Sequence, residues 1–162
     1  MASNRFDIVI VGAGFAGMYM LHKARKLGLS ARVLEAGTGV GGTWYWNRYP
    51  GARVDIESMQ YSYQFDDDLA QEWEWSEKYS PQPQLLEYAN HVAERFDLFK
   101  DIQFNTRVAS AKYDETAAEW TLTAEDGSET IGRLYVMATG CLSVPNRPHI
   151  DGLDDFDGPV YQ

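Results

Sequence analysis

The sequence lacks the features of several large protein classes. It has a single cysteine, Cys141, so it cannot form an internal disulfide, and such sparse cysteine is typical of a reducing compartment. No apolar run reaches the ~18 residues of a membrane span. The amino terminus also lacks the basic start and apolar segment of a secretory signal. We therefore expect a soluble, cytoplasmic protein without a membrane partner.

Positive charge is also scarce, with 14 Lys and Arg against 24 Asp and Glu and a net charge of −10. Nucleic acids and anionic membranes are held by clustered cations, so we expect neither as a partner. The three histidines show no metal-ligand spacing, which predicts no metal site. We expect His22 and His91 on polar helix faces and His149 in a loop. Without a histidine partner in the sequence, Cys141 favours a small buried residue over a catalytic thiol.

The first 35 residues carry the pattern of a dinucleotide-binding fold. Residues 7–11 are a β-branched apolar run, which suits a strand buried on both faces of a parallel sheet. Gly12, Gly14 and Gly17 follow as G-x-G-x-x-G. The first glycine permits a tight turn, the second lets the backbone approach a pyrophosphate, and the third lets a helix pack closely on the strand. This order predicts a dinucleotide site.

The helix that follows is expected to bind phosphate at its amino end. Free N–H groups at Phe15, Ala16 and Gly17, together with the helix dipole, favour an anion there. The helical period predicts an inward face that consists of Ala16, Met20, Ala24 and Leu27. The outward face then consists of His22, Lys23, Arg25 and Lys26.

A second apolar strand, residues 31–34, ends at Glu35. A carboxylate at this place accepts the hydroxyls of an adenosine ribose and repels a 2′-phosphate. The residues alone therefore predict FAD or NAD as the first nucleotide, and not NADP.

Residues 36–58 form a glycine-punctuated loop that is rich in Trp and Tyr. Large aromatic rings are costly to expose, so we expect four of them to bury against either the protein core or a flat cofactor ring: Trp44, Tyr45, Trp46 and Tyr49. Gly41, Gly42 and Thr43 are placed to approach a cofactor through backbone N–H groups and a hydroxyl.

The remaining chain predicts one long helix and a run of short strands. Residues 83–96 show a helical period, and residues 108–113, 120–123 and 130–135 are short runs separated by polar turns, typical of an antiparallel meander. Residues 134–138 then return as an apolar strand. We predict an α/β, Rossmann-like dinucleotide-binding fold with a parallel sheet and an inserted three-stranded β-meander.

One long motif resembles a known family. Residues 41–58, GGTWYWNRYPGARVDIES, are similar to the signature of Baeyer–Villiger monooxygenases, and the likeness to their amino-terminal FAD-binding part covers nearly the whole chain. The resemblance implies FAD in the first site and NADPH as the reductant. It further implies that O2 and a ketone are converted to an ester or lactone by way of a peroxyflavin.

The resemblance also implies roles for single residues. It places Glu35 on the adenosine ribose and Thr43 with Trp44 beside the flavin. It implies that Tyr61 and Val108 contact the cofactor. It also implies that the A-T-G segment at residues 138–140, which ends at Gly140, closes the site. Asp55 is implied to lie near the reactive edge of the flavin as the catalytic candidate, where it orients an arginine from another part of the enzyme; capping of the turn at 55–58 is the alternative. Arg53 either lies toward the nicotinamide or forms a surface salt bridge.

The end of the chain resembles the start of the family motif F-x-G-x-x-x-H-x-x-x-W-P, with Gln162 where the family has histidine. A second G-x-G-x-x-G and the NADPH domain are absent from these 162 residues. We therefore interpret residues 1–143 as an FAD-binding domain, with the meander at about 106–135, and residues 144–162 as a connector toward an NADPH-binding domain. The remainder of that enzyme is then a partner, and the piece alone is expected to bind FAD without turnover.

Two other functions stay open from the sequence. One is another flavoprotein of the same fold, such as an N-oxygenating monooxygenase or an oxidase. The other is a non-catalytic nucleotide-binding module that holds FAD or NAD.

Overall fold

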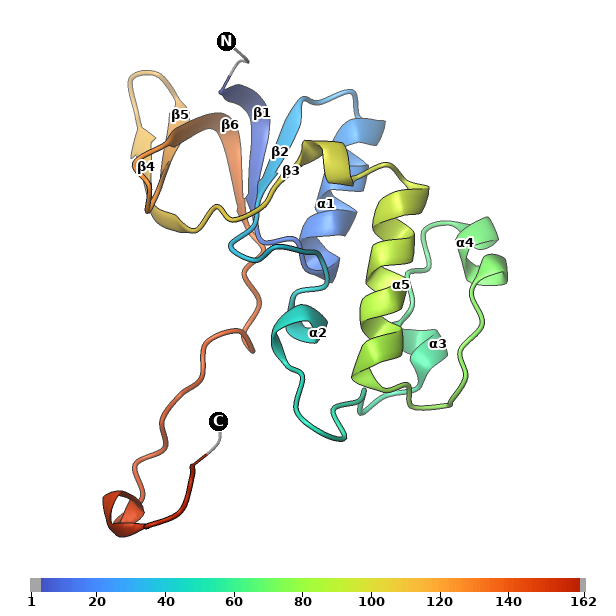
Figure 1. Cartoon of the computed structure of the whole chain (residues 1–162). Helices are drawn as coiled ribbons and strands as arrows, with labels where there is room; N and C mark the ends of the chain where they lie inside the picture. The colour runs from blue at the N-terminus through green and yellow to red at the C-terminus, as the bar shows by residue number, and fades with distance from the viewer. Residues whose placement is uncertain (1–3, 161–162) are drawn as a thin grey trace.

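The structure is a computed structural model that describes residues 4–160, and a single sheet organises it. The sheet has six strands in the order β3-β2-β1-β6-β5-β4 (Figure 1). Its strands are β1 (Arg5–Val11), β2 (Ala31–Leu34), β3 (Ile102–Gln103), β4 (Val108–Asp114), β5 (Glu119–Ala124) and β6 (Glu129–Met137). Strands β3, β2, β1 and β6 run parallel to one another. Strand β5 pairs antiparallel with β6, and β4 pairs antiparallel with β5. The predicted α/β fold is confirmed.

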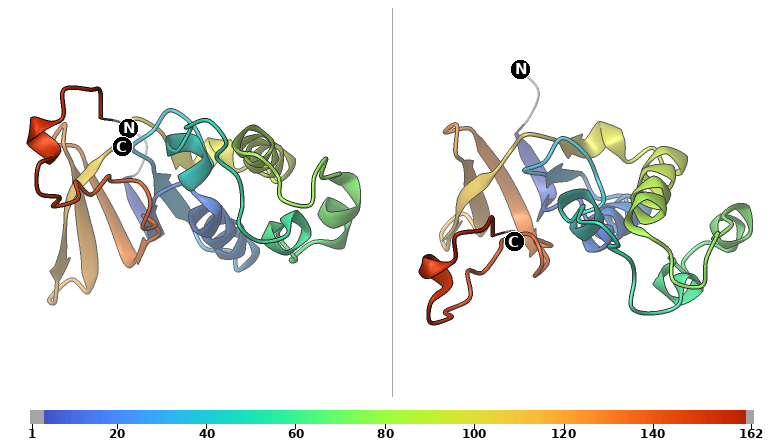
Figure 2. Two further views of the ribbon diagram at one scale, coloured as in Figure 1. Left: turned by 90° about the horizontal axis from the view of Figure 1, so that it is seen from below. Right: turned by 60° about the horizontal axis from the view of Figure 1, so that its bottom comes forward.

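The α-helices gather on the side of the sheet away from β4 and β5, as Figure 2 shows for α1 and α5. The helical segments are α1 (Phe15–Lys26), α2 (Thr43–Trp46), α3 (Ser58–Tyr61), α4 (Asp67–Glu72), α5 (Gln82–Arg95) and the 3-10 turns η1 (Phe99–Asp101) and η2 (Leu153–Asp155). After β6 the chain runs away from the sheet (Figure 1). Within residues 4–160, no helix combines the length and the apolar character that crossing a membrane requires.

Strand β1 is buried on both faces, which explains its unbroken apolar run. Ile8 and Ile10 pack into the core that α1 and α5 cover. Val9, on the opposite face, packs against Leu122 of β5 and the half-buried Trp120. The parallel strands therefore lie between a helical layer and the curled antiparallel strands, so a site must form at the ends of the strands and not on a face of the sheet.

The meander is part of the main sheet and shares a strand with it. Residues 129–132 of β6 pair antiparallel with β5, and residues 131–137 pair parallel with β1. The sequence predicts a third meander strand followed by a separate return strand, and in the structure these are one continuous strand. Val108, at the start of β4, lines the same cleft as Val11 and Leu34 at the carboxyl ends of β1 and β2. The segment before β4 is held there because the backbone N–H of Thr106 donates to the carbonyl of Glu35 at 2.8 Å.

The predicted burial of α1 is wrong at three positions. Ala16, expected on the inward face, is exposed and lines the cleft described below. His22, expected on the polar face, is 7% exposed and packs between the rings of Phe65 and Phe96 at 4.5 and 4.8 Å. Leu27, expected on the inward face, is 75% exposed because it lies at the C-cap of the helix. The layer formed by residues 62–65 and α5 covers a flank of α1 that the helical pattern alone assigns to solvent.

Two further expectations about single residues fare differently. Cys141 is exposed, which contradicts the prediction of a small buried residue, because the chain has already left the sheet there. His149 is exposed in a loop, as predicted.

We expect His22 to make the chain acid-sensitive. Burial lowers the pKa of His22 from its ordinary 6.5, and nearby Lys26, Lys23 and Arg25 lower it further, while Asp66 opposes them. The unfolded chain therefore binds the proton first, and the free energy of unfolding falls as the pH drops from about 6.5 through the lower pKa of the folded state, by at most about 1.4 kcal/mol per pH unit.

Urea unfolding at pH 7.5 and pH 5 measures this effect. The variant His22→Phe should lose that part of the pH dependence, whereas His149→Phe, at an exposed position, should keep it. An unchanged difference between the two pH values in His22→Phe would show that other groups cause the acid sensitivity.

Candidate functional site

The turn between β1 and α1 is closely packed around glycine. Gly12 has a φ of +102°, and a Cβ atom there would lie 2.6 Å from the carbonyl oxygen of Ala138. A Cβ atom on Gly17 would lie 1.9 Å from the carbonyl oxygen of Gly12. The end of β6, the turn and the first turn of α1 can therefore meet only without side chains. The roles predicted for the first and third glycines match this packing.

The amino end of α1 points into open space without a cap. Gly14 is the N-cap residue, no side chain caps the helix, and its first turn holds no acidic residue. The first N–H groups of the helix therefore have no partner within it, and the helix dipole adds positive potential at the same place. This arrangement suits a phosphate group.

An aromatic layer holds this end of α1 from behind. The hydroxyl of Tyr63 donates a hydrogen bond to the carbonyl of Phe15, and the hydroxyl of Tyr88 accepts one from the backbone N–H of Tyr63 at 3.0 Å. Burial raises the pKa of Tyr63, so its hydroxyl stays protonated and remains a donor. The ring of Phe15 contacts Tyr61, Tyr63 and Tyr88. The turn before α1 is therefore anchored to the segment after α3.

A second glycine loop closes over the first. Gly42 has a φ of +54°, and a Cβ atom on it would lie 2.8 Å from the Cα atom of Gly14. The backbone N–H of Gly41 donates to the carbonyl of Ala13 at 3.0 Å. Contact between Gly14 and Gly42 thus places Thr43 next to the amino end of α1.

Glu35 lies at the end of β2 and is 5% exposed. Its carboxylate accepts the backbone N–H of Ala13 at 2.6 Å and that of Gly37 at 2.7 Å. Because an ionised carboxylate offers about four acceptor positions, two remain for other donors such as ribose hydroxyls. The two backbone bonds hold the carboxylate in one orientation at the edge of the cleft.

These elements enclose a cleft of about 740 Å³ at the carboxyl ends of the strands. This volume is in the range of small-molecule and cofactor sites. Ten of the predicted site residues line it: Gly12, Gly14, Phe15, Ala16, Glu35, Gly42, Thr43, Tyr61, Val108 and Gly140. The structure thus brings together residues that lie up to 128 positions apart in the chain, from Gly12 to Gly140.

Four predicted site residues lie elsewhere, and two of them stand directly behind the cleft wall. Gly17 is packed under the turn. Trp44 is 7% exposed in the core with Val54 and Leu85. Its indole N–H donates to the Tyr61 hydroxyl at 2.9 Å, so it supports a residue of the wall. Burial raises the pKa of Tyr61, which keeps that hydroxyl neutral.

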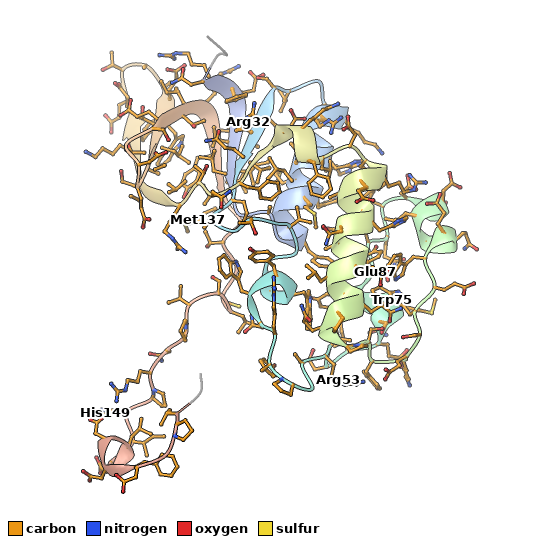
Figure 3. All side chains as sticks on the ribbon, viewed as in Figure 1. Arg32, Arg53, Trp75, Glu87, Met137 and His149 are labelled. Carbon is orange, nitrogen blue, oxygen red and sulfur yellow. The ribbon has the colours of Figure 1, made fainter. Side chains whose placement is uncertain are left out.

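Arg53 and Asp55 lie beyond this wall. Arg53 pairs with Glu77 at 2.9 Å and donates to the carbonyl of Tyr79 at 2.8 Å, so it forms the surface salt bridge that was one of its two predicted roles. Figure 3 shows it well apart from Met137, which lines the cleft. Asp55 is exposed, and its charge contributes to the raised pKa of Tyr61. Helix α3 has Glu57 at its N-cap position without a side-chain cap, so Asp55 does not cap it.

The four aromatic residues of the loop separate in the structure. Trp44 is buried in the core, and Trp46 lines the cleft while 42% exposed. The ring of Tyr45 packs against the loop at Gly37, and its hydroxyl accepts the N–H of Thr38 at 3.0 Å. Tyr49 is 65% exposed, so the prediction that all four are buried is wrong for Tyr49.

Sequence reasoning missed several residues that line the cleft, among them Thr106, Arg107, Met137, Leu142 and Val144. The available signal was their position, because Thr106 and Arg107 follow β3 and Met137 ends β6, at the edge of the sheet where Gly12 and Glu35 also lie. Gln162, which stands where the family motif has histidine, lies outside the described residues.

Comparison with known proteins gives consistent matches over nearly the whole chain. The profile of the family described as pyridine nucleotide-disulphide oxidoreductase matches residues 9–161. Phenazine N-monooxygenase PhzNO1 of Lysobacter antibioticus is 47% identical over 97% of this chain and 29% of its own length. A Baeyer-Villiger monooxygenase of Pseudooceanicola batsensis is 42% identical over 96% of this chain and 29% of its own.

A solved structure described as oxidized steroid monooxygenase bound to NADP is 55% identical, with a TM-score of 0.86 over 93% of this chain and 29% of that one. The chain therefore spans 29% of the length of each of these three proteins. The resemblance to Baeyer–Villiger monooxygenases noted in the sequence is confirmed at the level of both sequence and fold.

We expect Gly12→Ala to destabilise the chain far more than Gly28→Ala. Both glycines have a positive φ, at +102° and +74°, but nothing lies within 4 Å of a Cβ atom on Gly28. Gly28→Ala should cost about 1–2 kcal/mol for the backbone conformation alone. Gly12→Ala adds a clash with backbone, which we expect to cost a further ~1–3 kcal/mol.

Urea unfolding of both variants and of the unmodified chain measures the two free energies. Equal losses would show that the turn can move away from β6, and that close approach is not what the glycine provides.

Proposed function

This chain belongs to the family of pyridine nucleotide-disulphide oxidoreductases, and from that membership we propose that it is the FAD-binding part of a Baeyer–Villiger monooxygenase. The observation that carries the proposal is the glycine-lined cleft that runs from Glu35, past the open end of α1, to Thr43 and Tyr61. An enzyme of this kind uses NADPH and O2 to convert a ketone to an ester or lactone.

The residues of the cleft fit FAD. The uncapped end of α1, with Gly12 and Gly14 beside it, would hold the diphosphate without a side chain in the way. Glu35, with two acceptor positions left, would bind the adenosine ribose. Thr43 and Tyr61 would lie toward the flavin, where Trp44 keeps Tyr61 in place. When bound, FAD supplies the oxygen chemistry, and the chain binds and orients it.

The domain organisation that we propose is an FAD-binding domain over residues 1–143 and a connector over 144–162. Because the chain spans 29% of the length of these relatives, the NADPH-binding domain and the rest of the FAD site belong to the proposed longer enzyme. The chain alone then binds FAD without turnover. A cytoplasmic location stays a prediction that rests on the sparse cysteine.

Asp55 is the residue of this chain that we propose for the reaction itself. It follows Arg53 in the chain, it is exposed, and its charge acts on Tyr61 of the cleft wall. A carboxylate there would orient an arginine from the remainder of the enzyme through a charge-assisted pair. It acts as a positioning and electrostatic residue and donates no proton.

One observation favours a second candidate function. The phenazine N-monooxygenase is 47% identical to this chain, and its name describes oxygen transfer to nitrogen. The FAD-binding part of an N-oxygenating enzyme would use the same cleft, because the residues that line it hold the cofactor and not the acceptor of the oxygen. Product analysis with a ketone and with a nitrogen heterocycle distinguishes the two functions.

We expect the purified chain to bind FAD and to show the absorbance of a bound flavin. Glu35→Gln should weaken FAD binding at least about tenfold, since one neutral oxygen then replaces acceptors for the ribose hydroxyls and for two backbone N–H groups. Glu119→Gln, remote from the cleft, is the matched control. Equilibrium titration followed by flavin fluorescence measures both constants.

Addition of NADPH to the FAD-loaded chain should cause little bleaching. A chain that takes up no FAD would contradict the proposed function, and rapid stoichiometric bleaching would contradict its assignment as a part that depends on the rest of the enzyme.

We expect Asp55→Ala, made in the longer enzyme, to lower the rate of ketone oxygenation at least about tenfold, while FAD stays bound. The loss reflects a misplaced arginine, so Asp55→Glu should restore part of the rate. Oxygenated product and NADPH oxidation are measured together. Unchanged values of both in Asp55→Ala would remove Asp55 from the reaction.

A further inference from the structure

Arg107 is the one cationic side chain that lines the cleft within residues 4–160, and Glu35 is the one anionic side chain. Arg107 lies on the segment between β3 and β4, next to the buried Thr106 and to Val108 at the start of β4. Neither the motif at residues 41–58 nor the glycine turn includes it. Its role in the site is therefore open.

The backbone around Arg107 is tied to the ribose side of the cleft. The N–H of Thr106 donates to the carbonyl of Glu35 at 2.8 Å, and that of Asn105 donates to the carbonyl of Gly37 at 3.0 Å. The carbonyl of Arg107 accepts the N–H of Glu125 at 2.9 Å. Bonds on both sides thus hold the backbone of Arg107 at a constant position relative to the carboxylate of Glu35.

The side chain of Arg107, in contrast, is weakly held. Its nearest charged partner is Glu125, with 3.9 Å between Nε and Oε1, and the two side chains are 56% and 65% exposed. An exposed pair at this distance contributes little stability. The guanidinium group is therefore free to contact a ligand at the rim of the cleft.

The order of the strands indicates which part of a dinucleotide lies there. The carboxyl ends of β1, β2 and β3 are adjacent in that order in the sheet. The open end of α1 follows β1 and suits the diphosphate, and Glu35 follows β2 and suits the ribose. The next group along the dinucleotide is the adenine base, which then lies beyond Glu35, against the segment that follows β3.

We propose that Arg107 binds the adenine base of the dinucleotide by stacking its guanidinium group on the face of the purine ring. The guanidinium is planar and weakly hydrated, and it stacks on aromatic faces in a way that an ammonium group does not. Thr106 and Val108 form the wall beside it. This inference rests on the proposed function, since it presupposes a dinucleotide in the cleft.

Four variants test the assignment: Arg107→Gln, Arg107→Lys, Glu125→Gln and Arg133→Gln. Arg107→Lys retains the charge but loses the planar group. Glu125→Gln removes the ion-pair partner alone. Arg133 is an exposed arginine on β6 that does not line the cleft and serves as the matched control. For each, titrations of the 162-residue chain with FAD, ADP and inorganic pyrophosphate give three dissociation constants.

Both Arg107 variants should bind FAD and ADP about 2- to 30-fold more weakly, the range expected for one stacked cation. Their affinity for pyrophosphate should not change, and Glu125→Gln and Arg133→Gln should bind all three ligands as the unmodified chain does. Normal FAD and ADP binding by Arg107→Lys, or weaker pyrophosphate binding by Arg107→Gln, would overturn stacking in favour of a charge that acts on the diphosphate. An equal loss in Glu125→Gln would overturn it in favour of a purely structural pair.

The outcome also separates this inference from the proposed function. If the unmodified chain binds FAD and the Arg107 variants bind it equally well, the role of Arg107 fails and the proposed function stands. If the unmodified chain binds neither FAD nor ADP, both fail together.

Discussion

The whole site depends on backbone segments that touch where no side chain can fit. Gly12 meets Ala138 at the end of β6, Gly17 meets Gly12, and Gly14 meets Gly42 of the next loop. Each contact requires a glycine, because a Cβ atom on Gly12, Gly17 or Gly42 would lie less than 3 Å from backbone atoms. The result is a cleft whose floor is backbone, so that N–H groups and a helix dipole, and not cationic side chains, offer the attraction for a diphosphate. This explains how a chain with a net charge of −10 can hold an anionic cofactor.

A floor made of backbone needs rigid support, which aromatic residues provide. Tyr63 and Tyr88 hold the carbonyl side of Phe15, and Trp44 holds Tyr61 through its indole N–H. The rings of Phe15 and Tyr63, and those of Trp44 and Tyr61, also pack against each other. Such ring pairs contribute about 0.5–1.5 kcal/mol each beyond the area that they bury. Trp44 of the motif therefore acts from behind the cleft wall, where it fixes Tyr61, a residue that faces the cleft.

In the proposed function, the strand order sets the direction in which a dinucleotide lies. Parallel strands bring their carboxyl ends to one edge, and neighbouring strands β1, β2 and β3 present the turn, Glu35 and the segment at Thr106 side by side. The start of β4 reaches the same edge because the backbone N–H of Thr106 donates to the carbonyl of Glu35 at the end of β2. Residues as distant in sequence as Gly14 and Val108 thereby line one cleft.

The sequence by itself determined the local pieces of this protein. The strand at β1, the glycine turn, the helix after it and the acidic end of β2 all follow from short-range patterns of apolar period and missing side chains, and the motif at residues 41–58 led to the family. What only the tertiary structure decided were contacts between remote segments. The burial of His22 depends on Phe65 and Phe96. The placement of Trp44 behind Tyr61 depends on the packing of α2 against α5. The continuous strand β6, which joins the predicted meander strand and return strand, depends on pairing with β1. A one-dimensional pattern records the period of each element, but distant residues settle which second surface covers a given face. Arg107 and Met137 belong to no motif, and only their positions at the ends of strands place them in the site.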